Sequence, residues 1–521
     1  LSPLVIILKK NSDFNGLMYL IQKCRICKKS VVILHNIKER DIDFIGKIVQ
    51  NIKKRNKSSG VGKGEHTMKN NKYEIDMCNG SIMDKLISFA LPLMLSGILQ
   101  LMFNAVDIIV VGKFSGNESL AAVGSTTALI NVFTNLFIGI SLGANVLAAR
   151  LYAAGKDKEM SETVHTAIAL ALVSGIIMAF VGWICAKPAL ELMDTPGDVI
   201  GLSSLYMRIY FLGMPFFMLY NYGAAILRAV GDTKRPLLFL VISGIANTGL
   251  NLCFVIIFKL GVAGVAIGTV ISQLISCVLV LRCLCRSETS YQLRFSKLKI
   301  NKKYMIQIFQ VGVPAGIQST VINFSNVLLQ SSVNSFGSVA MAGYTAANNI
   351  LGFLYQSINS VTQACMSFTS QNYGVGKYKR MDRVLADCMI LTVAVSLIIG
   401  CSAYFFGNYI LRIYTSDAEV IKCGLEILSI TTVPYFLCGI MDLFPGALRG
   451  MGYSAVPMIL SVIGTVGMRV LWIYAVFPLN RSLYVLFISY PASWGITIVP
   501  QVICYIFVRN KVHGKIKNIY A

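Results

Sequence analysis

A single carboxylate, Asp107, lies inside a long apolar stretch of this chain. It is the only ionisable residue from Leu86 to Val111, and a charge at the centre of a lipid bilayer costs about 2.5–3.5 kcal/mol even on lenient scales. Such a residue is expected to face other helices or water. Gln100, Asn104 and Asp107 are spaced by four and then three residues, so they share one helical face.

A second polar pair, Asn247 and Asn251, lies four residues apart on another apolar segment, which places both amides on one helical face. Counted at 1.5 Å per residue from the flanking lysines, Asn251 lies about 12 Å and Asp107 about 9 Å inside the membrane. We therefore expect the two polar patches to meet. One carboxylate and two amides can bind a proton, since burial disfavours the charged carboxylate, or can offer oxygen ligands to a sodium ion.

Less specific roles compete with these. Asp107 could serve only to satisfy neighbouring polar groups. For Asn247 and Asn251, a hydrogen bond between helices is as good an interpretation as ion binding.

Asp442 is a second carboxylate within an apolar segment. It precedes Arg449 by seven residues, two helical turns, so a structural ion pair is as good an interpretation as ion coupling. Further candidates for a substrate cavity are Tyr220, Tyr222 and Asn326. Aromatic and methionine side chains adapt to varied ligands, although packing against other helices is the commoner role of any one of them.

The composition places these residues in an integral membrane protein. Of the 521 residues, 55% are hydrophobic and 14% are charged, and the mean hydropathy is +0.65, whereas charged residues make up about 25% of a soluble protein. A helix needs about 20 apolar residues to cross a bilayer. We predict an all-α membrane protein with twelve transmembrane helices, at roughly 86–111, 119–150, 163–186, 198–227, 236–258, 261–284, 304–331, 338–370, 384–408, 418–447, 455–477 and 483–508.

One pattern, Leu-Arg-x-x-Gly-x4-Pro, occurs twice, the second copy 221 residues after the first. We predict two pseudo-symmetric six-helix lobes, one from residues 68–300 and one from residues 301–521. In each copy the arginine can bond carbonyls at a helix end, the glycine permits the turn, and the proline starts the next helix. These residues, which we interpret as structural, are Arg228, Gly231 and Pro236 in the first copy and Arg449, Gly452 and Pro457 in the second.

Basic residues gather in the loops on one side of the predicted helices: between segments six and seven, between eight and nine, and after twelve. Because basic loops stay in the cytoplasm, both termini are predicted to be cytoplasmic. The net charge of +23 suits contact with anionic membrane lipids, and we expect no nucleic-acid partner. The cysteines are scattered without a paired metal-ligand pattern, so no metal site is predicted.

Residues 1–67 differ from the rest, with 14 Lys/Arg, 5 Asp/Glu and no segment long enough to cross a membrane. The run Lys63-Gly64-Glu65 can be encoded by a purine-rich sequence that resembles a bacterial ribosome-binding site. Our hypothesis is that translation begins at Met68. The alternative is a genuine basic extension, as in other basic tails.

From Ser81 onward the chain resembles the multidrug and toxic compound extrusion (MATE) family of secondary transporters. The resemblance rests on Leu91-Pro92, Asn104-Ala105-Val106-Asp107, Leu120-Ala121-Ala122-Val123-Gly124, Gly261-Val262-Ala263-Gly264-Val265-Ala266 and the two repeated turns. It implies two six-helix lobes around a cavity, and export of cationic or amphipathic small molecules in exchange for H⁺ or Na⁺. It also implies a protein of the bacterial plasma membrane, which we expect to be a monomer without a cofactor.

In this family an acid on the first helix works with an Asn-x3-Asp pattern on the fifth helix to bind the coupling cation. Asp107, Asn247 and Asn251 occupy the matching positions, so an amide replaces the second acid. One proton can neutralise a single carboxylate, which favours proton over sodium coupling.

Two other functional classes fit this sequence less well. A lipid-linked saccharide flippase, which related two-lobed folds can be, is expected to place several Arg or Lys inside its cavity, and segments one, two, seven and eight have none in their interiors. An intramembrane enzyme is not expected, because the predicted spans contain no His/Glu metal pattern and no Gly-x-Ser-x-Gly motif.

Overall fold

The computed structural model describes residues 73–193 and 195–520, which belong to one compact unit. The basic segment 1–67 and the predicted start at Met68 lie outside the described residues. The regular elements of the described part are all helices.

The first lobe comprises α4 to α10. In this lobe α7 and α8 together form one span, which bends by 48° at Gly213, two residues before Pro215. The elements are α4 (Ile82–Phe114), α5 (Asn117–Ala153), α6 (Asp157–Leu192), α7 (Gly197–Leu212), α8 (Met214–Ala229), α9 (Lys234–Leu252) with its π-helical continuation η1 (Cys253–Ile257), and α10 (Gly261–Cys285).

The second lobe comprises α11 to α19, and the loop before it contains the short η2 (Phe295–Lys297). Here α15 and α16 bend by 51° around Pro434; proline lacks the backbone N–H that would continue the helix. The elements are α11 (Lys302–Asn334), α12 (Ser338–Gly374), α13 (Tyr378–Phe405), α14 (Gly407–Leu411), α15 (Ala418–Thr431), α16 (Tyr435–Gly450), α17 (Ala455–Ser461), η3 (Val462–Gly467), α18 (Met468–Leu471), η4 (Trp472–Val476), η5 (Phe477–Leu479) and α19 (Leu483–Tyr520).

The prediction of an all-α membrane protein with twelve transmembrane helices in two lobes is confirmed. Nine helices or helix runs of the described residues are long and apolar enough to cross a membrane, and each of the two bent pairs passes the same test as one span. The remaining span is α12, whose 37 residues include many Ser, Thr, Asn and Gln.

Several helices extend beyond their predicted bounds; for example, α13 begins at Tyr378 rather than near residue 384. In addition, the tenth span bends and the eleventh span contains π-helical turns. The last helix, α19, runs to Tyr520, about three turns beyond the predicted end near 508. Apolarity marks the part of a helix inside the lipid, whereas the backbone hydrogen bonds continue into its polar ends.

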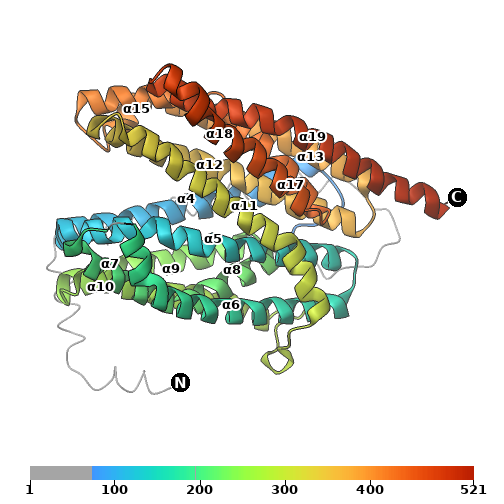
Figure 1. Ribbon diagram of the computed structural model, residues 1–521. Helices are drawn as coiled ribbons and strands as arrows, with labels where there is room; N and C mark the ends of the chain where they lie inside the picture. The colour runs from blue at the N-terminus through green and yellow to red at the C-terminus, as the bar shows by residue number, and fades with distance from the viewer. Residues whose placement is uncertain (1–72, 194, 521) are drawn as a thin grey trace, which may run out of the picture. The chain divides into compact units, whose positions relative to one another are not determined.

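Two helices cross between the lobes. Leu86 and Phe89, near the start of α4, pack in a hydrophobic cluster with second-lobe residues such as Phe368, while Tyr304 and Ile308, near the start of α11, pack in the core of the first lobe. Figure 1 shows α4 and α11 lying between the α5–α10 group and the α12–α19 group.

The lobes meet most closely where α5 passes α11. A Cβ atom added to Gly139 would lie 2.3 Å from the backbone of Gly316, and one added to Gly143 would lie 2.1 Å from the carbonyl oxygen of Ile308. Glycine at these positions lets the two helix backbones touch, as small residues do in membrane helix interfaces.

Candidate functional site

The carboxylate of Asp107 and the amide of Asn251 meet between α4 and α9. Nδ2 of Asn251 donates a hydrogen bond of 2.5 Å to Oδ1 of Asp107, and both side chains are buried. The predicted meeting of these two residues is therefore present in the structure. A hydrogen bond to a charged acceptor is about twice as strong as a neutral one, so this contact compensates part of the cost of burying Asp107.

Asn247 extends this group by one helical turn. Its Oδ1 accepts a 3.4 Å hydrogen bond from Nδ2 of Asn251, and its own Nδ2 donates to Oγ1 of Thr269 on α10 at 3.4 Å. The four residues Asp107, Asn247, Asn251 and Thr269, hereafter the acidic site, connect three helices of the first lobe.

The carbonyl oxygen Oδ1 of Asn251 is buried and accepts no hydrogen bond among the described residues. A Cβ atom added to Gly268 would lie 2.2 Å from this oxygen, so the glycine makes room for it. An unsatisfied buried acceptor costs about 1–3 kcal/mol. The oxygen beside Asp107 is therefore a ready partner for a bound cation or for the proton of a neutral carboxylic acid.

Sequence reasoning missed the part that α7 and α10 play around Asp107. Tyr206 and Tyr210 of α7 are buried or half-buried and lie close enough to interact with the Asp107 charge. Thr269 could have been found from its position, because polar residues are few on the segment that begins at Gly261. Nothing in the spacing of the tyrosines links them to Asp107.

Gln100 and Asn104 do not join the acidic site. Both side chains are exposed, and neither forms a side-chain hydrogen bond within the described residues. Their contact with a substrate stays a prediction.

In the second lobe Asp442 is half-buried on α16, and its carboxylate forms neither a hydrogen bond nor an ion pair within 4.0 Å in the described part of the chain. A direct ion pair with Arg449, considered from the sequence, is thus not formed among the described residues, although the two side chains are close enough for their charges to interact. Instead, Nη2 of Arg449 donates a 2.6 Å hydrogen bond to Oε1 of Gln318 on α11. Two helical turns separate Asp442 from Arg449, and the arginine side chain extends toward α11.

The other candidate residues have packing roles in this structure. Tyr222 is completely buried in the core of the first lobe, and the Tyr220 hydroxyl donates to the carbonyl oxygen of Pro236 at 3.3 Å. Asn326 accepts a 3.0 Å hydrogen bond from Nη1 of Arg469, a buried arginine to which the sequence reasoning assigned no role.

The two repeated turns have matching backbones. Gly231 and Gly452 have φ angles of 95° and 90°, in the left-handed region that glycine adopts without strain. Pro236 and Pro457 are each the third residue of the helix that follows, where the missing N–H is not needed.

A family model described as MatE matches residues 92–253 and again residues 314–474, more than half of the chain. The chain belongs to the MATE family of multidrug efflux transporters. The two matches fall on the two lobes, so the internal repeat is a repeat of the family's own unit. The first match contains Asp107, Asn247 and Asn251.

The relatives of this MATE transporter include curated bacterial proteins. It is 29% identical over 433 residues to the probable multidrug resistance protein YoeA of Bacillus subtilis, covering 81% of this chain and 93% of YoeA. It is 24% identical over 408 residues to the multidrug export protein MepA of Staphylococcus aureus, covering 78% and 90%. These are transporters rather than enzymes, and the family needs no cofactor.

The fold is shared with solved MATE structures. A structure of the outward-facing conformation of a multidrug resistance MATE family transporter superposes with a TM-score of 0.77 at 20% identity, covering 87% of this chain and all of that one. A MATE structure in the bent conformation gives a TM-score of 0.76 at 19% identity.

A segment of the transporter that precedes α4 joins the two lobes at one end. This leading segment, residues 73–81, bonds to the first lobe through Glu74, whose carboxylate accepts hydrogen bonds from the hydroxyls of Tyr152 at 2.6 Å and Tyr291 at 2.7 Å. Gly231 packs against the segment, since a Cβ atom there would lie 2.5 Å from the carbonyl oxygen of Ile75.

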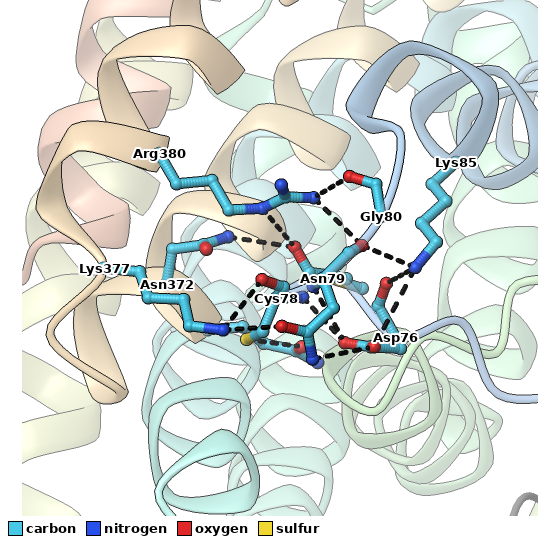
Figure 2. A network of polar contacts seen from close by, with 10 residues as sticks. Asp76, Cys78, Asn79, Gly80, Lys85, Asn372, Lys377 and Arg380 are labelled. Carbon is cyan, nitrogen blue, oxygen red and sulfur yellow. Dashed lines mark hydrogen bonds and ion pairs between the residues drawn. The ribbon is translucent and has the colours of Figure 1, made fainter. Parts of the chain in front are cut away.

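The same segment bonds to the second lobe through side chains of α12, α13 and the loop between them (Figure 2). Arg380 donates to the carbonyl oxygens of Gly80 at 2.9 Å and Asn79 at 3.0 Å, and Lys377 donates to Oδ1 of Asn79 at 2.6 Å. Nδ2 of Asn372 donates to the carbonyl oxygen of Met77 at 3.1 Å. Cationic and amide donors of the second lobe therefore hold a backbone whose other side is held by the first lobe.

Electrostatics within the leading segment are set by Asp76 and Cys78. Burial alone would raise the pKa of the Asp76 carboxyl, but hydrogen bonds from the Cys78 N–H and from Asn79, with the charge of Lys85, lower this pKa below its ordinary value. Burial and the nearby Asp76 charge raise the pKa of the Cys78 thiol to about 11. Asp76 is thus charged and Cys78 neutral at physiological pH.

Other hydrogen bonds between the lobes lie toward the same end, which carries the basic loops and is hereafter the basic end. Ser367 on α12 donates to Oδ1 of Asn145 at 3.1 Å, Ser370 donates to the carbonyl oxygen of Val146 at 2.6 Å, and Gln371 donates to the carbonyl oxygen of Ala229 at 2.7 Å. In the described structure, no hydrogen bond between the lobes lies in the half of the molecule that contains Asp107.

Proposed function

We propose that this transporter exports cationic or amphipathic small molecules from the cytoplasm in exchange for a proton, with a sodium ion as the alternative coupling ion. The observation that carries the proposal is the acidic site: a buried carboxylate, Asp107, beside the unsatisfied carbonyl oxygen of Asn251. The names of YoeA and MepA support multidrug export.

Protonation changes what Asp107 can do. As a carboxylate it only accepts hydrogen bonds, and it accepts one from Nδ2 of Asn251. As a neutral acid it also carries an O–H donor, which the free Oδ1 of Asn251 could accept once the amide has rotated. A rotation of the Asn251 amide would exchange its two ends and alter the contacts with Asn247 and Thr269. Proton binding would thereby change the packing of α4, α9 and α10.

The basic end would face the cytoplasm, as expected from the distribution of Lys and Arg. Among residues 73–193 and 195–520, hydrogen bonds join the lobes there and not around Asp107, so we assign this structure to a state closed toward the cytoplasm. Opening on that side requires release of the leading segment by Asn372, Lys377 and Arg380, together with separation of the backbone contact at Gly139 and Gly316. Alternating access would couple this release to the protonation of Asp107.

A lipid-linked saccharide flippase is the less favoured alternative. The curated relatives have names that refer to drug resistance and export.

Transport by the purified protein in lipid vesicles tests the proposal. Vesicles loaded with a cationic dye would be given either a pH gradient or a sodium gradient alone, with the membrane potential clamped. We expect dye movement driven by the pH gradient. Movement that depends strictly on sodium would identify sodium as the coupling ion, and the absence of gradient-driven movement of any dye tested would contradict the export function.

A further inference from the structure

A buried arginine, Arg469, lies in the second lobe at a depth where charge is costly. It is the only charged residue between Ala455 and Leu479 and is 4% exposed. Ten residues separate it from Leu479, the end of η5, which corresponds to about 15 Å along a helix. A charged side chain at such a depth usually faces the interior of a helix bundle and serves a function.

The partners of Arg469 are all neutral. Its Nη1 donates to Oδ1 of Asn326 on α11 at 3.0 Å, its Nε donates to Oγ of Ser493 on α19 at 3.4 Å, and its guanidinium carbon lies 4.3 Å from the centre of the Tyr490 ring. Within residues 73–193 and 195–520, no acidic side chain comes within 4.0 Å of it. The ring stabilises the cation but leaves its charge uncompensated.

The internal repeat relates this site to the acidic site. Asn326 follows Asn104 by 222 residues, and α17 begins 221 residues after α9. With the latter shift, Arg469 corresponds to Thr248, the neighbour of Asn247. Both sites use the first, fifth and sixth spans of their lobe. At related positions, therefore, the first lobe buries an acid and the second lobe buries a base.

An unpaired buried cation does not stabilise a fold, because no partner offsets the free energy lost on its desolvation, and an apolar residue would stabilise the lobe at least as well. A bound anion would offset this loss of free energy. The guanidinium group, with its planar set of N–H donors, matches a carboxylate in shape and charge.

Further aromatic side chains pack beside Tyr490. Tyr490 stacks with Phe487 at 6.0 Å and contacts Trp494 at 5.7 Å between ring centroids, and Trp494 contacts Tyr435 at 5.2 Å. Aromatic rings attract one another in offset-stacked and edge-to-face arrangements, so this cluster favours an aromatic ligand next to Tyr490.

We propose that Arg469, with Asn326 and Tyr490, binds the carboxylate of an aromatic, amphipathic substrate in the second lobe. This inference rests on the proposed export function and defines part of its substrate range, namely compounds that carry an acidic group. These compounds bind in the second lobe, whereas Asp107 binds the coupling cation in the first lobe. Charge separation between the lobes keeps the anionic substrate group away from Asp107.

The test is a comparison of 1-naphthoate with its neutral amide, 1-naphthamide, as ligands of the purified full-length protein in lipid nanodiscs, by calorimetry. We expect the wild-type protein to bind the carboxylate about 10- to 100-fold more tightly than the amide. Arg469→Gln should remove this preference, and Arg469→Lys should keep part of it. Thermal unfolding of each variant shows whether it is folded. Should Arg469→Gln fail to fold, Asn326→Ala, which removes only one partner, is expected to reduce the preference.

The outcomes separate this inference from the export function. Asp107→Asn should leave the carboxylate preference intact while gradient-driven export is lost. In the wild-type protein, by contrast, a carboxylate preference without gradient-driven export would contradict the export function alone. Equal binding of acid and amide by the wild-type protein, no binding of either, or an unchanged preference in Arg469→Gln would overturn the proposed site. Complete displacement of 1-naphthoate by chloride would overturn it as well, because it would identify a site for simple anions.

Discussion

Asn251 donates a hydrogen bond to Asp107 across 144 positions of the chain. The bond places an amide where a second acid would make the site doubly charged. The pair thus carries a single negative charge, and a single proton neutralises it. Two predictions concern this pair, and two concern the leading segment.

Replacement of Asp107 by Asn should abolish coupled export. The amide keeps the shape of the side chain and can still form a hydrogen bond with Asn251, but it cannot gain or lose a proton. Dye binding should therefore persist, while export under a pH gradient should fall to the level of vesicles without protein. Glu191→Gln is a matched control, because it removes an exposed acid that, in the described part of the chain, forms an ion pair only with Lys187, at 3.7 Å. Undiminished export by Asp107→Asn would refute the coupling role of Asp107.

Replacement of Asn251 by Asp should shift the coupling toward sodium. Two carboxylates at hydrogen-bond distance repel each other, and a sodium ion between them can take oxygen ligands from both, whereas a proton bonds covalently to one oxygen only, although either cation leaves the same net charge. We expect dye export by this variant to respond to a sodium gradient to which the wild-type protein is indifferent. The measurement is export with each gradient imposed separately. A variant that ignores sodium would show that the number of acids does not select the ion.

Replacement of Arg380 by Ala should loosen the leading segment. Arg380 bonds three backbone carbonyls of this segment, so its loss should increase the rate at which iodoacetamide labels Cys78 by on the order of tenfold. The Arg380 charge lowers the pKa of Cys78, and its removal alone would slow the reaction; faster labelling must therefore come from opening.

Mass spectrometry of the peptide that contains Cys78 measures this rate separately from the other cysteines. Lys379→Ala is the control, because it removes a neighbouring cation that is exposed and forms no hydrogen bond in the described structure. Equal labelling rates in the two variants would show that Arg380 does not hold the lobes together.

Labelling of Cys78 in the wild-type protein should also depend strongly on pH. The thiolate is the reactive form, and burial raises the pKa of Cys78 from 9.0 to about 11. Below that value the thiolate fraction grows tenfold with each pH unit, so the labelling rate should still rise between pH 9 and pH 10. A plateau near pH 9, as for an exposed thiol, would show that the segment is open in solution.

Much of the candidate site could be predicted from residue types. The cost of a charge in lipid marked Asp107, and helical spacing placed Asn247 and Asn251 on one face. The same cost applies to Arg469, so the sequence also contained the signal for the second buried charge. The tyrosines of α7 and the room that Gly268 makes for Asn251 could not be predicted, because periodicity tells which residues share a face but not which helix that face contacts.

The sequence by itself determined the twelve spans and the two-fold repeat. These follow from local properties: apolar length and repeated spacing. Only the tertiary structure decided that the start of α4 packs in the opposite lobe, that Gly139 meets Gly316, and that residues 73–81 join both lobes. Such contacts depend on how rigid helices with several apolar faces pack together. The packing depends on the shapes of all the helices, and the sequence of one segment does not specify it.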